Sequence, residues 1–252
     1  MQDMNTHPTL ESALNFRFRG HDSRDWAEWH ERHAYNDAGS IPLDATKALI
    51  GRQKLNYRGI SERPALRHLI AANVDQPFLE EISDLTDLER LELEWPMTAK
   101  DLSPLLRLEQ LAFLSIDSPR NIADFRLVLD LPVLRTLIIT NPTRMVNLEW
   151  LAEAHHLEVI GIEGGTWTPY TIQTLRPIAG LRSLRAFLGV STKLSDKSLA
   201  PLADCPSLEY LGIACVAPQA EFNGLKAAKP DLICDWFRPE MWTALKSTRQ
   251  HS

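Results

Sequence analysis

The sequence predicts an α/β solenoid, in which short parallel strands alternate with short helical or irregular returns along a coil. Two observations predict it. Apolar residues recur at steps of three, three and two, as in LTDLERLELEW at residues 85–95, and this pattern returns about every 23 residues. A helix favours steps of three and four and a strand favours steps of two, so each unit is a turn that enters a short strand.

The repeat is found by sliding this pattern along the chain. Full copies are Leu85, Leu88, Leu91, Leu93; Leu108, Leu111, Leu114, Ile116; Leu131, Leu134, Leu137, Ile139; Ala154, Leu157, Ile160, Ile162; and Cys205, Leu208, Leu211, Ile213. Between residues 181 and 190 the pattern is blurred, because Gly189 takes the last slot and Leu188 and Val190 offer a competing register. The third positions lie at 91, 114, 137, 160, 187 and 211, so the first three intervals are equal.

A single unit buries only one narrow apolar edge, so neighbouring units must stack to form a continuous core. The last two apolar residues of each unit lie on one face of a short strand. The segments between strands should return on the opposite side as short helices, with Thr98, Asn121 and Ser195 available as N-caps. Prolines inside these returns should keep the helices short or irregular.

Four segments, LTDLERLELEW, LEQLAFLSID, LPVLRTLIITN and CPSLEYLGIA, resemble leucine-rich repeats. The resemblance covers about residues 65–236 and implies a curved solenoid with its strands on the concave side. The family often carries Asn or Cys three residues after the final strand leucine. Here those positions hold Pro96, Pro119, Pro142, Gly165 and Val216, so the turns must satisfy their backbone in another way.

Both ends of the array are expected to be capped, because an open solenoid end exposes its core. Residues 1–64 do not repeat and are predicted to form a helical N-terminal cap, with one helix at DWAEWHERHAY and another at DATKALIGR. Residues 65–236 form the predicted solenoid of about six to eight units. Residues 237–252 are the C-terminal cap or tail, and the apolar residues available at that end are Trp236, Phe237, Met241 and Trp242.

The charge distribution argues against nucleic acid as a partner. Net charge is −6; residues 1–64 are neutral by count, and the remainder holds 18 basic and 24 acidic residues. A nucleic-acid backbone would need a basic stripe, whereas an acidic excess favours a basic protein surface. No apolar run reaches about 18 residues and no secretory signal is evident, so we expect no membrane span and a cytoplasmic location.

No motif in the sequence indicates catalysis, a cofactor or a bound metal. In WHERH the spacing of His30 and His33 does not match HExxH, and the alternative to a metal site with His21 and Asp25 is a solvated helix face. The adjacent glycines of EGGTW are expected to permit a wide turn. The cysteines are three in number and form no CxxC, which favours reduced thiols.

The concave face provides the predicted binding site. If Leu91 and Leu93 point into the core, the alternate strand positions form an apolar stripe with acidic residues near one edge. Strand propensity alone, coverage by the chain's own tail, or a docked partner could each explain the stripe. Under the partner interpretation, the predicted partner-binding residues are Glu92, Glu94, Trp95, Phe113, Asp117, Ile138, Val159, Glu163, Leu188 and Tyr210.

The leading functional hypothesis is a non-enzymatic protein–protein interaction module that binds a protein partner on its concave face. Such a module would act as an inhibitor, an immunity-type neutraliser or an adaptor; this follows from analogy of fold. The competing hypothesis is an effector or enzyme in which residues 1–64 carry the activity and the repeats select the substrate. A third is a structural role through self-association.

Overall fold

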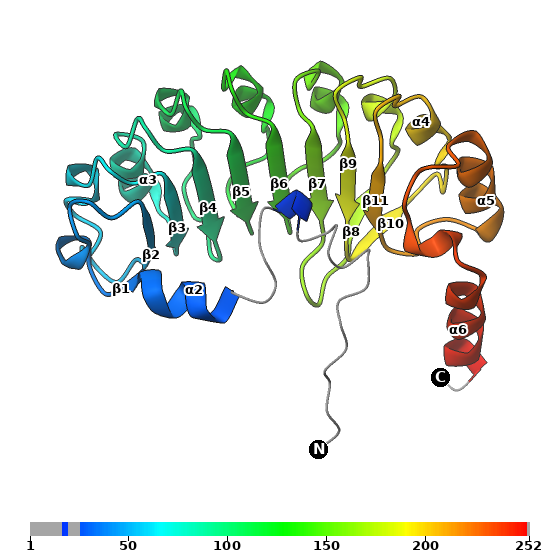
Figure 1. Ribbon diagram of the computed structural model, residues 1–252, viewed down its shortest axis with the longest axis horizontal. Coiled ribbons are helices and arrows are strands. Elements are labelled where there is room, and N and C mark those ends of the chain that lie inside the picture. The colour runs from blue at the N-terminus through cyan, green and yellow to red at the C-terminus, as the bar shows by residue number, and fades with distance from the viewer. Residues whose placement is uncertain (1–16, 20–25, 251–252) are drawn as a thin grey trace.

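Nine parallel strands line the inner curve of an arch in the computed structural model, which describes residues 17–19 and 26–250 (Figure 1). The strands of this sheet, in spatial order, are β1 (Ala34–Tyr35), β2 (Lys47–Gly51), β3 (His68–Ala72), β4 (Arg90–Glu94), β5 (Phe113–Asp117), β6 (Thr136–Thr140), β7 (Val159–Glu163), β9 (Ala186–Gly189) and β11 (Tyr210–Ile213). A second, two-stranded parallel sheet pairs β8 (Tyr170–Ile172) with β10 (Thr192–Leu194).

The returns lie on the outer curve of the arch (Figure 1). The α-helices in these returns are α3 (Gln76–Ile82), α4 (Ala200–Ala203) and α5 (Gln219–Ala228). Two further α-helices are not returns: α2 (Trp26–His33) lies beneath the N-terminal strands, and α6 (Pro239–Gln250) projects from the C-terminal end (Figure 1). The 3-10 helices span Ala38–Ser40, Ile60–Glu62, Ser103–Arg107, Arg126–Asp130, Glu149–Glu153, Arg176–Ile178 and Asp235–Phe237. Several returns are therefore a single helical turn, as the prolines predict.

The leucine pattern becomes a ladder of buried side chains behind the sheet. Each third position of the pattern pairs with the same position in the next unit, from Leu91 through to Leu211. These side chains are at most 1% exposed, and burying one leucine contributes about 1.5–3 kcal/mol. The architecture is a leucine-rich-repeat solenoid, as the sequence predicts. In the blurred unit Phe187 faces the core and Leu188 the concave side, which resolves the competing register.

The sheet extends further toward the N-terminus than the repeat pattern indicates. The predicted helix at DATKALIGR is wrong, because residues Lys47–Gly51 form strand β2, which pairs with β3. Ala48 and Ile50 are fully buried, whereas Leu49 between them is only half-buried. This period of two indicates a strand, but only Ile50 is a large apolar residue. Strand β1 adds two residues beyond β2.

The C-terminal end of the coil is closed by aromatic side chains. Trp236 and Trp242 lie edge to face at 5.3 Å, and both rings contact Phe222 of α5. Trp236 Nε1 donates a hydrogen bond to the carbonyl oxygen of Ile213, at the end of β11. Beyond β11 the only ladder contact in the described part of the chain is a single bridge from Tyr210 to Ile233.

A row of Asn and Ser residues ties the turns together where the family's usual residue is missing. Asn73, Ser118, Asn141 and Ser191 all have φ between 51° and 59°, a left-handed conformation that Asn adopts more readily than most residues. Asn141 Nδ2 donates to Ser118 Oγ at 3.0 Å, and Asn73 Nδ2 donates to the carbonyl oxygen of Arg52 at 2.9 Å. Each such bond joins one unit to the next.

Candidate protein-binding surface

Pairing of the strands places the concave side chains in three rows. The apolar members of the first two rows form one surface, which we call the floor: Phe113, Ile138, Val159, Ala186, Leu188 and Tyr210. The third row lies at the carboxyl ends of the strands. Its acidic members, which we call the acidic edge, are Glu94, Asp117 and Glu163.

Two glycines leave space for large side chains of the floor to lie close to the sheet. A Cβ atom on Gly161 would lie 2.9 Å from Cγ2 of Ile138, and one on Gly212 would lie 3.0 Å from Cε1 of Tyr210. The first distance is shorter than real Cβ contacts, and the second is tighter than nine in ten of them, so a side chain at either position would force Ile138 or Tyr210 to shift. The glycines therefore let two large side chains lie across neighbouring backbone.

The chain's own N-terminal segment covers the floor. Residues 17–19 form one helical turn on the concave side, and Phe18 is only 7% exposed (Figure 1). Its ring stacks on that of Tyr210, with 5.6 Å between centroids and 12° between planes. No floor residue is more than 9% exposed. The apolar stripe is thus buried against part of its own chain, and that part is the N-terminal segment and not the tail.

Arginine side chains hold the covering segment in place. The Arg19 guanidinium forms an ion pair with Glu163, whose side chain is 6% exposed, and Arg90 Nη2 donates to the carbonyl oxygen of Arg19 at 2.7 Å. The guanidinium carbons of Arg17 and Arg185 lie 5.7 and 5.9 Å from the centre of the Phe18 ring. These are cation–π distances, so Phe18 sits between apolar and cationic neighbours.

A polar network at the β3–β4 end positions Arg90. Its guanidinium lies 3.4 Å above the ring centre of Phe113, and its Nε donates to Oε1 of Glu92 at 2.9 Å. His68 Nε2 is 2.9 Å from the same oxygen, and the Trp29 ring of α2 lies 4.8 Å from the His68 ring. Burial lowers the pKa of His68, against the opposing effect of Glu92. Glu92 is therefore engaged within the protein.

Large aromatic side chains project from the loops beyond the acidic edge. Trp95 directly follows β4 and is 59% exposed, and Trp167 lies in the loop after β7 and is 93% exposed. Val190, after β9, is 47% exposed. Burial raises the pKa of Asp117, although its hydrogen bond from Ser118 Oγ at 2.9 Å acts the other way. Parallel strands bring all these residues to one edge, which we call the loop edge.

The predicted binding residues thus fall into two groups. Phe113, Ile138, Val159, Leu188 and Tyr210 lie in the covered floor. The rest lie in the polar network or at the loop edge: Glu92, Glu94, Trp95, Asp117 and Glu163. Sequence reasoning missed Phe18, Arg19 and Arg90. The alternation of aromatic and basic residues in NFRFRG was the available signal for a segment with one face to bury.

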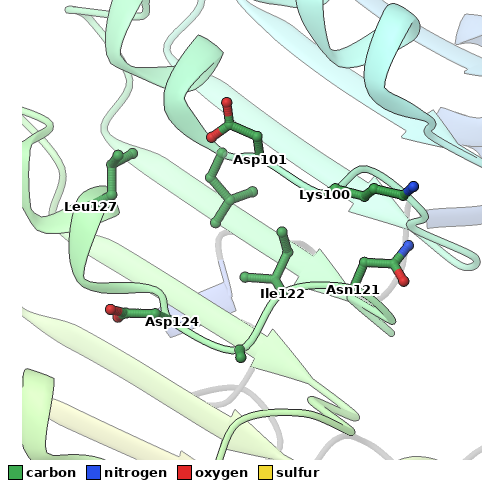
Figure 2. A pocket seen from close by; sticks show the side chains of 8 residues that line it. Lys100, Asp101, Asn121, Ile122, Asp124 and Leu127 are labelled. Atoms are coloured by element: carbon green, nitrogen blue, oxygen red, sulfur yellow. The ribbon is translucent and has the colours of Figure 1, made fainter.

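The hollows on the outer side of the arch are shallow and separate from the floor. One of about 310 Å³ lies between two neighbouring returns, with Asp101 and Asp124 on its rim and Ile122 between them (Figure 2). Both carboxylates cap the start of a local turn, since Asp101 accepts from Ser103 N at 2.8 Å and Asp124 from Arg126 N at 2.9 Å. Their role is thereby explained by local structure.

Neither a metal-binding cluster nor a membrane-spanning helix is present among the described residues. In ranges 17–19 and 26–250, no three His, Cys, Asp or Glu side chains are grouped so as to hold a metal ion. His21 and Asp25 lie outside the described residues. Among the helices that the structure describes, none is both long and apolar enough to cross a bilayer.

The solved structures that this chain resembles include two internalins and a protein described as a leucine-rich-repeat protein. An internalin (inlF) from Listeria monocytogenes aligns with 68% of this chain and 55% of its own length, at 18% identity and a TM-score of 0.46. Internalin C2 from the same organism aligns over 81% of this chain and 85% of its own, at 18% identity and a TM-score of 0.44. A leucine-rich-repeat protein of Leptospira interrogans aligns over 79% and 63%, at 15% identity and a TM-score of 0.45. No protein-family model and no curated protein matches the sequence.

Proposed function

We propose that this chain is a protein-binding module whose accessible recognition surface is the loop edge of the concave sheet. The observation that carries the proposal is the pair of exposed tryptophans, Trp95 and Trp167, beside the acidic edge. A tryptophan exposed to water gains free energy when a partner covers it, and aromatic residues are enriched among binding hot spots.

The proposed partner is a protein with a basic surface. Glu94 and Asp117 lie at the loop edge, and the acidic surplus of the chain falls after residue 64. The strands that precede the tryptophans, β4 and β7, are three positions apart, or about 14 Å at ordinary strand spacing. That separation fits within one protein–protein interface of standard size. Such a module would neutralise its partner or recruit it by covering part of its surface.

Site-specific photo-crosslinking tests this proposal. A benzoyl-phenylalanine at position 167 should capture one defined protein from a lysate of the source organism, identified by mass spectrometry. The matched control carries the same group at Leu106, which is 37% exposed in the return Ser103–Arg107 on the outer curve of the arch, and should not capture that protein.

The captured protein, once purified, allows a quantitative test. Trp167→Ala should weaken its binding about tenfold or more, the range for a hot-spot residue. Asp117→Asn should weaken it less, with a difference that shrinks at high salt, because Asp117 is only half-buried and salt screens its charge in part. Equal capture from positions 167 and 106, or unchanged affinity in the Trp167→Ala variant, would refute the proposed surface.

A further inference from the structure

The contacts that residues 17–19 make with the sheet are of the kind that a bound peptide makes. One aromatic side chain, Phe18, packs against the apolar floor. The next residue, Arg19, forms an ion pair with a buried carboxylate, Glu163. A sheet residue, Arg90, donates a hydrogen bond to a backbone carbonyl of the segment. An apolar anchor, an ion pair and a main-chain hydrogen bond together specify both chemistry and orientation.

The covering segment is not part of the packing that holds the solenoid together. The floor and Phe18 form a cluster of their own, distinct from the leucine core behind the sheet. Arg19 and Glu163 are 144 positions apart in sequence, so no repeat contact fixes them together. The backbone hydrogen bonds that pair the nine strands run between the strands themselves and not to residues 17–19.

The floor extends well beyond Tyr210, the residue on which the Phe18 ring stacks. It is built from six residues of five adjacent strands, β5, β6, β7, β9 and β11. The glycines that flatten it, Gly161 and Gly212, serve the concave side and not the leucine core. At its border stand Glu163 and the Arg90–Glu92 pair, which supply charge of both signs. The apolar and charged parts together match a segment whose aromatic residue is flanked by a cation.

We propose that the floor and Glu163 form a binding site for a partner segment in which an aromatic residue is followed directly by arginine, and that Phe18 and Arg19 occupy this site as an internal competitor. The inference deepens the proposed function, because it rests on that function and names the chemistry of the partner segment. The exposed loop edge is then available for first contact, and the floor becomes available when residues 17–19 leave it.

A tethered competitor lowers apparent affinity without changing the site. A segment that belongs to the same chain as its site competes at an effective concentration of roughly millimolar. The apparent affinity for an external segment equals the intrinsic affinity multiplied by the fraction of molecules in which the site is empty. Removing the two side chains that hold the internal segment should therefore increase the affinity for an external one.

The test uses a fluorescent peptide, LNFRFRGHD, which copies residues 14–22, added to the full chain. The variant Phe18→Ala/Arg19→Ala should bind this peptide at least tenfold more tightly than the unmodified protein. A control peptide with the same two substitutions should lose binding. In the variant background, Glu163→Gln should weaken binding about fivefold or more, whereas Glu149→Gln, an exposed carboxylate on the outer side, should have no effect.

A second measurement keeps an aromatic ring at position 18 and leaves Arg19 unchanged. A 4-fluorophenylalanine placed at position 18 should give a fluorine resonance that moves to the position of a solvent-exposed ring when excess peptide is added. A resonance that stays unchanged at saturating peptide, or equal peptide affinity in the unmodified and doubly substituted proteins, would overturn the inference. So would a folded double variant, by circular dichroism, that does not bind the peptide.

The two proposals can fail separately. Trp95→Ala and Trp167→Ala should leave peptide binding unchanged, because neither side chain belongs to the floor. Peptide binding with no protein captured from position 167 would refute the proposed loop-edge function and leave the internal competitor standing. Capture at position 167 with no effect of Phe18→Ala/Arg19→Ala on peptide affinity would do the reverse.

Discussion

The two faces of the sheet bury apolar side chains equally well but for different reasons. Leu137 and Ile138 are neighbours in β6, on opposite faces, and they are 0% and 2% exposed. Leu137 is enclosed by the same position of adjacent units and by the returns behind the sheet. Ile138 belongs to the cluster covered by Phe18, a residue 120 positions away. Equal burial therefore does not imply an equal contribution to folding.

The largest expected effect comes from comparing these two neighbours. Leu137→Ala should lower the free energy of unfolding by about 2–5 kcal/mol, because the repeat leaves a cavity that cannot close. Ile138→Ala should cost at most about 2.4 kcal/mol, the transfer value for three methyl or methylene groups, because the covering segment can shift. Urea unfolding followed by circular dichroism gives both values.

Combining each substitution with Phe18→Ala sharpens the comparison. The cost of Ile138→Ala should shrink in that background, because the side chain is then already partly exposed to water. The cost of Leu137→Ala should not change, since it has no contact with the N-terminal segment. Additive effects for both pairs would mean that residues 17–19 are not what buries the floor.

A medium effect is expected where the two faces meet, at the ends of the strands. Asn141→Ala should cost about 1–2 kcal/mol, because it removes the hydrogen bond to Ser118 and leaves a non-glycine residue at φ 53° without side-chain support. Asn141→Gly, which adopts this conformation without strain, should cost less. A glycine variant as unstable as the alanine variant, again by urea unfolding, would show that conformation is not the cause.

The smallest effect concerns pH at the β3 end of the concave face. Because burial lowers the pKa of His68 from 6.5, folding favours its neutral form. Its contribution to stability is complete above pH 6.5 and is lost as pH falls below that value, where the unfolded chain binds the proton more readily. His68→Gln should therefore flatten the pH dependence of the unfolding free energy between pH 7 and 5. The same slope in both proteins would contradict this assignment.

The repeat made most of the sheet predictable. Leucines at steps of three, three and two predict β4, β5, β6, β7 and β11, because in every unit the pattern places the same side chains in the core behind the sheet. Strand β2 was missed because its inward positions, Ala48 and Ile50, follow no strong leucine steps and the small alanine indicates a helix equally well. The Asn and Ser row was missed because it stands closer to the strand than the family's usual position, and it follows some strands only.

The sequence predicts which side chains form the floor, but it does not predict that residues 17–19 cover them. Alternation within each strand placed Phe113, Ile138 and Tyr210 on the concave side correctly, since side-chain direction depends only on local geometry. The contact of Phe18 with Tyr210 joins segments 192 positions apart and depends on the curvature of the whole arch. No local pattern encodes such a contact, although alternating Phe and Arg indicates that one side of the segment is apolar.

The two flanks of the nine-stranded sheet determine whether molecules of this protein can associate by strand addition. A uniformly parallel sheet presents unused amide and carbonyl groups along its flanks, which can template fibre growth by strand addition. Strand β1 offers only two residues on one flank. On the other, beyond β11, Ile233 makes a lone bridge and aromatic rings fill the space. Polymerisation through sheet extension is thereby disfavoured, even at high concentrations of the protein.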